Sequence, residues 1–141
     1  MSDCLFCQIA GGELSASVVY RDESVLAFCD IQPVNPGHLL VIPLRHAVGL
    51  ADLDPADGAR LFAVAQRLAA ALHTTDGVRC DGVNLFLADG EAAMQEVFHV
   101  HLHVFPRFDG DGFGLRFGEQ YWTKPERADL ESVAAAIRTA L

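Results

Sequence analysis

An alternating segment in the second half of the chain places the strongest constraint on its fold. Residues 98–105 read FHVHLHVF, in which single apolar residues separate His99, His101 and His103. Successive side chains of a strand point to opposite faces, so the pattern predicts a strand whose histidines share one face. A solvated polar face is the alternative, but three histidines in register favour a functional surface. The residues predicted to face a core are Phe98, Val100, Leu102 and Val104.

The patterns before this segment predict further strands and one long helix. Residues 17–30 indicate a hairpin around RDES, residues 38–43 a buried strand that ends at Pro43, and residues 83–88 another strand. Apolar residues recur at helical spacing from about Pro55 to Leu72. Asp54 is the expected N-cap of this helix, with proline at its first position.

A closing helix is expected from near Pro125 to Ala140. Several strands around one central helix, with hairpin-length connections, favour an α+β fold, because a parallel sheet would need more crossover helices. We therefore expect a mainly antiparallel sheet of about five strands with a central helix and a C-terminal helix. The length favours one domain over residues 1–141.

Composition and charge exclude several classes of partner. Of the 141 residues 51% are hydrophobic, yet no stretch approaches the roughly 20 apolar residues of a membrane span. The formal net charge of −9 gives no electrostatic reason to bind a nucleic-acid backbone. The N-terminus, MSDCLFCQIAGGE, lacks the basic and apolar regions of a secretory signal, so we expect a cytoplasmic protein.

The spacing of the three histidines indicates that they do not all have the same role. At about 3.3 Å per residue, the Cα atoms of His99 and His103 would lie about 13 Å apart, so one metal ion shared by all three would strain the strand. With an ordinary pKa of about 6.5, imidazole can act as acid, base or nucleophile near neutrality. The spacing therefore favours a chemical role for one or two histidines and a separate role for another.

The N-terminal pair Cys4-x-x-Cys7 is weak evidence by itself, since a metal pair, a redox pair and two buried thiols are comparable readings. His46 and His99 are the candidates to complete a tetrahedral zinc site. Cys29 and Cys80 have no visible partners, so we expect them to be small buried apolar residues.

Several segments resemble the histidine triad (HIT) superfamily. Residues 99–105 match its signature, His-x-His-x-His followed by two hydrophobic positions. NPGHLLVIP at 35–43 is similar to its Gly-His-x-Leu-Val-Ile-Pro segment, and LAFCDI at 26–31 resembles the strand that carries its ribose contact. QEVF at 95–98 matches the usual lead-in, and CLFCQIAGGELSA and GDGFG look like bacterial members. The resemblance covers nearly the whole chain and indicates the bacterial zinc-carrying branch of HIT hydrolases.

This resemblance implies a nucleotide hydrolase or transferase that needs no catalytic metal. His101 would attack the α-phosphorus of a nucleoside phosphoramidate or a dinucleoside polyphosphate, and water would cleave the nucleotidyl-histidine to release a nucleoside monophosphate. His103 and His38 would bind phosphate oxygens, and Asp30 would accept hydrogen bonds from the ribose. The substrate would be a purine nucleotide, and family members are typically homodimers.

The resemblance also assigns a nucleotide pocket and a metal site. Gln95 lies in the lead-in and would contact the nucleotide. The base pocket would comprise Leu5, Phe6, Ile9, Phe28, Ile31 and Leu40, although each read alone is more often core. A structural zinc would be held by Cys4, Cys7, His46 and His99, against the alternative of free thiols.

Three positions before the triad depart from the family pattern. Ala88 replaces a common asparagine, Met94 a glycine that lets the backbone approach the phosphate, and Glu96 a hydroxyl donor. These departures leave open a nucleotide-binding sensor or scaffold with weak or lost turnover. A metalloenzyme that uses the triad as ligands is a third reading.

Overall fold

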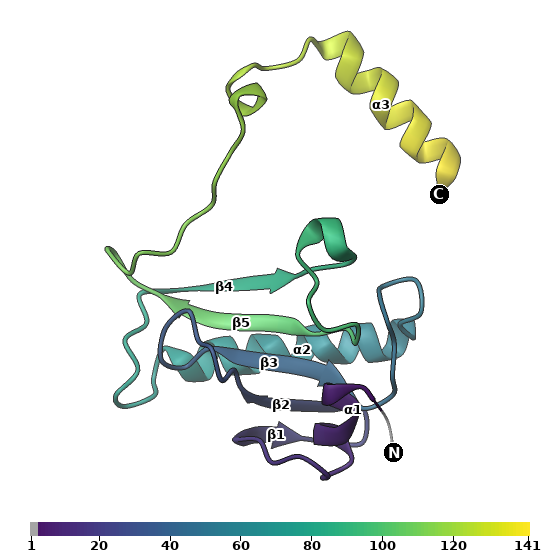
Figure 1. Ribbon diagram of the computed structural model, residues 1–141. Helices are drawn as coiled ribbons and strands as arrows, with labels where there is room; N and C mark the ends of the chain where they lie inside the picture. The colour runs from purple at the N-terminus through teal and green to yellow at the C-terminus, as the bar shows by residue number, and fades with distance from the viewer. Residues whose placement is uncertain (1–2) are drawn as a thin grey trace. The chain divides into compact units, whose positions relative to one another are not determined.

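In the computed structural model, which describes residues 3–141, five strands form one antiparallel sheet in the order β1-β2-β3-β5-β4 (Figure 1). The strands comprise β1 (Val18–Arg21), β2 (Val25–Cys29), β3 (Leu39–Pro43), β4 (Gly82–Leu87) and β5 (Leu102–Arg107). All four neighbouring pairs are antiparallel. The predicted α+β class with about five strands is confirmed.

Helix α2 (Pro55–Leu72) covers one face of the sheet, at the predicted bounds (Figure 1). The Asp54 side chain accepts a hydrogen bond of 2.8 Å from the Ala56 N–H, as expected of an N-cap. The core beneath the helix takes alternate residues of β2 and β3, because alternate side chains of a strand share a face. These strand residues are Val25, Ala27, Leu39 and Val41.

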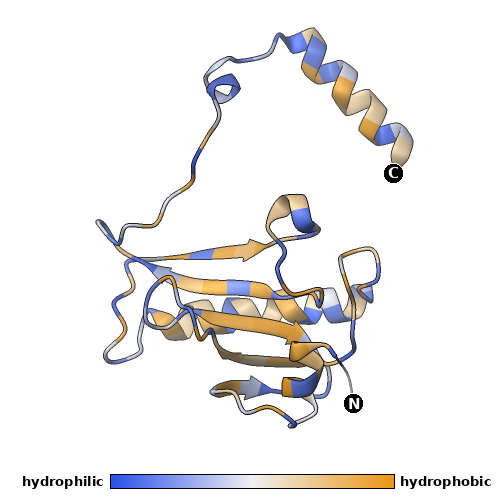
Figure 2. Cartoon of the chain, viewed as in Figure 1, coloured by the Kyte–Doolittle hydropathy of each residue, from blue (hydrophilic) through white to orange (hydrophobic). Residues whose placement is uncertain are grey.

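The other residues of the same strands form a second core with a short helix, α1 (Leu5–Ala10), that the sequence did not predict. Phe6 of α1 packs with Leu26, Phe28, Leu40 and Ile42. Strands β2 and β3 therefore lie between two helical layers, which explains their continuous hydrophobic sequence (Figure 2).

The strand predicted over residues 98–105 begins only at Leu102, so the first half of that prediction was wrong. Residues 98–101 form an irregular segment, in which the Val100 N–H donates to the Ala47 carbonyl outside the sheet. Phe98, predicted to face the core, is 47% exposed, whereas His99 is fully buried. Only His103 lies on the strand, paired with Leu40 of β3 and therefore on the face covered by α1.

The chain divides into two compact units, of which the first ends at Asp111 and contains the sheet. The second, Gly112–Leu141, contains a short 3₁₀ helix (Glu119–Trp122) and α3 (Arg127–Ala140), close to the predicted closing helix. Almost every residue of the second unit is exposed, including Leu130, Val133 and Ile137 of α3. The expected single domain over residues 1–141 stays a prediction.

Within residues 3–141 no helix is both long enough and apolar enough to cross a membrane.

Candidate functional site

A tight turn fixes His38 at the start of β3. Gly37 has a φ of 101°, and a Cβ at this position would meet the Val78 side chain at 3.0 Å, so only glycine fits the turn. The buried Asn35 side chain donates a 2.9 Å hydrogen bond to the Pro106 carbonyl and thereby anchors the turn to the end of β5. His38 is 4% exposed and has little freedom to move.

A chain of hydrogen bonds runs through His38 to His103. The Val34 N–H donates to His38 Nδ1 at 2.9 Å, so the proton of a neutral His38 lies on Nε2. His38 Nε2 is 2.9 Å from His103 Nδ1 and therefore donates to it. The proton of a neutral His103 consequently lies on Nε2, where it is available to a ligand. Asp30 Oδ2 flanks the pair, 3.5 Å from His38 Nε2 and 3.9 Å from His103 Nδ1.

Both rings of this pair are neutral at pH 7. Burial lowers the pKa of His103 to about 4, helped by the neighbouring His101 and His38, while Asp30 acts in the opposite direction. Burial also lowers the pKa of His38, again against the effect of Asp30. The pair therefore offers a neutral N–H donor rather than a fixed positive charge.

His101 is oriented as a nucleophile. Its Nδ1–H donates to the His99 carbonyl at 2.8 Å, which leaves a lone pair on Nε2. His101 is only 6% exposed, but no side-chain nitrogen or oxygen of residues 3–141 is both fully buried and without a hydrogen-bond partner. His101 Nε2 makes no hydrogen bond within these residues, so this atom reaches solvent. The rings of His101 and His103 lie with their centroids 5.0 Å apart. The lone pair of His101 Nε2 and the N–H donor of His103 thus belong to neighbouring rings.

Phe6 supports the His101 ring from behind. The ring centroids of Phe6 and His101 are 5.1 Å apart in an edge-to-face arrangement, and Phe6 also contacts His99 at 6.0 Å and Phe28 at 5.7 Å. Phe6 is 5% exposed, so α1 contributes a wall for the histidine as well as a layer of the core.

The four predicted metal ligands converge at the other end of the irregular segment. One ligand atom each of Cys4, Cys7, His46 and His99 lies within 4.8 Å of the others. His99 Nδ1 is 3.5 Å from both thiol sulfurs and 3.3 Å from His46 Nδ1. The thiol of Cys7 is 3.2 Å from His46 Nδ1.

The chemistry of this cluster fits zinc. His99 Nε2 lies 2.8 Å from the Pro43 carbonyl, which can only accept, so its proton is on Nε2 and Nδ1 offers a lone pair to the cluster. Burial lowers the pKa of His99 and keeps the ring neutral, as a ligand must be. Two sulfurs and two imidazole nitrogens are a regular tetrahedral zinc set.

Asp30, His38 and His103 also lie close enough to hold an ion. The hydrogen bond from the Val34 N–H, however, leaves a proton on His38 Nε2, the atom that would have to bind the metal. The geometry therefore favours a hydrogen-bonded relay at this position.

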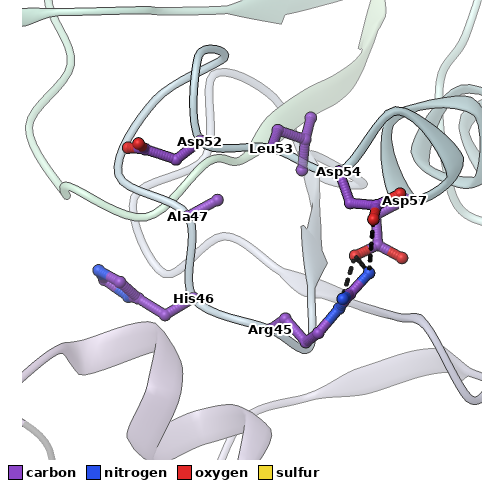
Figure 3. A pocket seen from close by; sticks show the side chains of 7 residues that line it. All are labelled: Arg45, His46, Ala47, Asp52, Leu53, Asp54 and Asp57. Atoms are coloured by element: carbon purple, nitrogen blue, oxygen red, sulfur yellow. Dashed lines mark hydrogen bonds and ion pairs between the residues drawn. The ribbon is translucent and has the colours of Figure 1, made fainter.

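The loop that carries His46 is held by an ion pair. Arg45 Nη2 donates to Asp57 Oδ2 at 2.9 Å and lies 3.3 Å from Asp54 Oδ2, at the start of α2. Figure 3 shows that Arg45 and His46 point to opposite sides of this loop. The cavity of about 240 Å³ beside them is lined by none of the triad histidines. We therefore do not take it as the reaction site.

The loop before the triad is fixed internally by Gln95. Its Oε1 accepts from the Gly90 N–H at 2.8 Å, and its Nε2 donates to the Val48 carbonyl at 2.6 Å. The predicted contact of Gln95 with a nucleotide would have to compete with these bonds. Met94 takes a left-handed conformation with a φ of 71°, and its side chain is 71% exposed. A left-handed backbone is typical of glycine, the residue that the resemblance leads us to expect at this position.

The residues predicted for the base pocket divide into two groups. Phe6, Phe28 and Leu40 are buried, whereas Leu5 is 46% and Ile31 99% exposed, and Ile9 is half-buried. The sequence reasoning missed the backbone groups of Val34 and Pro43, which set the histidine tautomers. No side-chain pattern could have identified them, because the N–H and carbonyl groups are common to nearly all residues.

Comparisons with known proteins agree on one family. A model of the HIT domain family matches residues 11–110. An uncharacterized HIT-like protein of Borreliella burgdorferi is 43% identical over 120 residues, covering 85% of this chain and 86% of the relative. The adenylylsulfatase HINT3 of Arabidopsis thaliana is 34% identical over 110 residues, covering 78% of this chain and 55% of the relative.

Solved structures match over nearly the whole length. A HIT family protein from Bacillus anthracis has a TM-score of 0.88 at 37% identity, covering 99% of this chain and 98% of that one. A zinc-bound histidine triad family protein from Mycobacterium smegmatis has a TM-score of 0.76 at 40% identity, with the same coverage of 99% and 98%.

Proposed function

Since the chain belongs to the HIT domain family, we propose that it is a nucleotide hydrolase or transferase in which His101 is the nucleophile. The observation that carries this proposal is the 2.8 Å hydrogen bond from His101 Nδ1 to the His99 carbonyl, because it leaves the Nε2 lone pair free to attack. The neutral donor His103, with its ring centroid 5.0 Å away, supports phosphorus as the target.

The reaction has two steps at one phosphorus atom. His101 Nε2 forms a bond to the α-phosphorus, and the bond to the leaving group breaks; the leaving group takes the electron pair and gains a proton from water. His103 Nε2–H donates to a phosphate oxygen, and His38 holds His103 in that tautomer. Water then attacks phosphorus, the N–P bond returns its electron pair to Nε2, and a nucleoside monophosphate leaves.

The proposed substrates are purine nucleoside phosphoramidates and dinucleoside polyphosphates. Both carry a nucleotidyl group that His101 could accept, and the adenylylsulfatase among the relatives supports an adenylyl conjugate. Asp30 would contact the ribose, and the residues proposed for the base pocket, Leu5, Phe6, Ile9, Phe28, Ile31 and Leu40, would contact the base.

We propose a structural zinc ion at the cluster of Cys4, Cys7, His46 and His99. The donor set and the zinc-bound relative support it. The ion would supply a crosslink between α1 and the segment before β5, with no part in the reaction at His101.

A single-turnover experiment tests the enzyme. The protein is mixed with a slight excess of an adenosine phosphoramidate, quenched, and analysed for the adenylylated protein by mass spectrometry. We expect adduct on the wild type, none on His101→Ala, and a loss of turnover of roughly 10³-fold or more in that variant. His73→Ala is the matched control, because His73 is exposed and belongs to neither cluster.

A nucleotide sensor with little turnover is the second candidate, favoured by Met94 and Glu96, two exposed residues of the loop that precedes the triad in the sequence. A carboxylate there repels an anionic substrate. The sensor predicts nucleotide binding without adduct in the wild type and faster turnover of a fluorogenic adenosine phosphoramidate by Met94→Gly/Glu96→Ser. Equal rates for the two proteins would rule out impairment by these residues.

We also propose that the protein is a homodimer. The exposed apolar residues of α3, Leu130, Val133 and Ile137, recur at helical spacing and support a surface that another chain covers. Light scattering coupled to gel filtration tests this, with twice the chain mass as the expected result.

A further inference from the structure

Asp30 is fixed so that one of its oxygens faces both histidines of the relay. It follows the last residue of β2, and its backbone N–H donates to the His38 carbonyl at 3.0 Å. Oδ1 accepts from the Gln32 N–H at 2.8 Å, which sets the plane of the carboxylate. Oδ2 is left to face His38 Nε2 at 3.5 Å and His103 Nδ1 at 3.9 Å.

No other charged residue is in a position to act on this pair in the same way. Among residues 3–141, Asp30 is the one acid whose carboxylate lies within 4.0 Å of either ring. The rings that contact His103 are those of His38 from the turn before β3, His101 from the segment before β5, and the uncharged Phe86 from β4. The charge on Asp30 is therefore the main local influence that favours protonation of these histidines.

Asp30 and His103 compete for one proton donor. His38 Nε2–H points to His103 Nδ1 at 2.9 Å, and Asp30 Oδ2 offers a second, longer acceptor at 3.5 Å. A ribose hydroxyl that donates to Oδ2 would draw that acceptor away from His38. The His38 donor would then be directed to His103 alone, which fixes the N–H of His103 toward the phosphate.

We propose that Asp30 is a positioning residue that couples recognition of the ribose to the donor state of His103, through His38. This inference rests on the proposed function, in which the phosphate of a ribonucleotide meets His103. It predicts that the ribose hydroxyls raise kcat as well as lowering KM.

The kinetic test combines one substitution with one change of substrate. Wild type and Asp30→Asn are each assayed with an adenosine phosphoramidate and with its 2′,3′-dideoxy counterpart. If Asp30 only accepted hydrogen bonds from the ribose, the substitution would have no effect on the dideoxy substrate. We expect kcat for the dideoxy substrate to rise roughly 5-fold in Asp30→Asn, because without a hydroxyl on Oδ2 the wild-type carboxylate competes with His103 for the His38 donor and the neutral amide competes less.

Two controls accompany these assays. Asp76→Asn removes an exposed carboxylate outside both clusters and should leave all four constants unchanged. Asp30→Glu keeps the charged acceptor and should not show the rise in kcat on the dideoxy substrate. Equal kcat values of wild type and Asp30→Asn on the dideoxy substrate would overturn the proposal.

A second measurement needs no turnover and therefore separates this inference from the proposed function. NMR of the protein with ¹⁵N-labelled histidine follows the tautomers and titration of His38 and His103. In Asp30→Asn we expect both rings to titrate at lower pH than in the wild type, because the opposing carboxylate is lost. Unchanged titration would contradict the role of Asp30 even in an active enzyme.

The wild type alone provides a last check, in case the variant does not fold. Adenosine should shift the His103 resonances and their titration, and 2′,3′-dideoxyadenosine at equal occupancy should not. Identical shifts with both nucleosides would exclude the coupling. Failure of the adduct experiment together with a hydroxyl-dependent shift would instead reject the enzyme and retain the coupling.

Discussion

Two clusters of histidines lie within one small unit, and they differ in the partner of the second ring nitrogen. In the cluster of Cys4, Cys7, His46 and His99, His99 Nε2 donates to the Pro43 carbonyl, so Nδ1 turns a lone pair toward the thiols. In the cluster of Asp30, His38 and His103, His38 Nδ1 accepts from the Val34 N–H, so Nε2 turns a proton toward its neighbours.

The comparison shows that the backbone decides what a histidine cluster can do. Both clusters bring potential ligand atoms within 4.8 Å of one another, so distance does not separate them. A carbonyl partner prepares an imidazole to bind a metal, whereas an N–H partner prepares it to donate a proton. His101 follows the first pattern, with a carbonyl partner and a free lone pair, and presents that lone pair to solvent.

The largest expected effect comes from breaking the first cluster. Cys7→Ser should lower the zinc content from about one equivalent to near none and reduce the free energy of unfolding by roughly 3 kcal/mol, because the ion would crosslink α1 to the sheet. Mass spectrometry of the native protein and thermal melting measure these changes. Cys80→Ser lies outside the cluster and should alter neither. Equal melting temperatures for Cys7→Ser and the wild type would contradict a structural ion.

The second cluster should not take up an ion. Titration of zinc into the metal-free protein, followed by calorimetry, should give one tight equivalent. His103→Ala should leave that stoichiometry at one, whereas His46→Ala should weaken the tight site by roughly 10-fold or more. A second tight equivalent that disappears in His103→Ala would show that the tautomer argument is wrong.

Lowering the pH should reduce the free energy of unfolding, because His38 and His103 are neutral in the folded protein. Burial lowers the pKa of His38, and that of His103 to about 4, from the ordinary 6.5. The folded state then holds fewer protons than the unfolded state, so this contribution is complete above about pH 6.5 and declines as pH falls toward 4. We expect a loss of roughly 1–2 kcal/mol, reduced by solvent screening of the partly exposed His103.

Urea unfolding at about pH 7.5 and pH 5 measures this loss, and His103→Asn separates it from the titration of carboxylates. The wild type should lose more stability than the variant between the two pH values. Equal losses of stability in the two proteins would show that His103 does not contribute to the pH dependence.

The smallest expected effect concerns the loop that leads into both clusters. Met94 has a left-handed φ of 71°, which costs a non-glycine residue about 1 kcal/mol. Met94→Gly should raise the free energy of unfolding by about 0.5 kcal/mol, since the greater freedom of glycine in the unfolded chain offsets part of the gain. Met94→Leu keeps the strain and should change stability little. A larger gain for leucine would show that the side chain, and not the backbone, is responsible.

The sequence was sufficient for the sheet and for the long helix, because their hydrophobic periods are regular. It was insufficient for residues 98–101, where period-two alternation continues although the strand does not. In that segment the Val100 N–H donates to the Ala47 carbonyl, which is remote in sequence, and the His99 carbonyl accepts from the ring of His101 instead of from a neighbouring strand. Helix α1 was not predicted for a related reason. Its six residues are too few to show a helical period, and Phe6 is held in place by its contacts with β2 and β3.

The order of synthesis gives the cysteine pair a further consequence. Cys4 is synthesised before its partner His99, which lies 95 residues later in the chain. Bringing Cys4 and His99 together closes a loop that costs about 4 kcal/mol in chain entropy. A nascent chain with only its first strands lacks His99, so it has an incomplete set of ligands and would gain little by holding an ion. A metal ion taken up at this cluster would therefore mark a chain whose synthesis has passed residue 99 and in which Cys4 and His99 have come together.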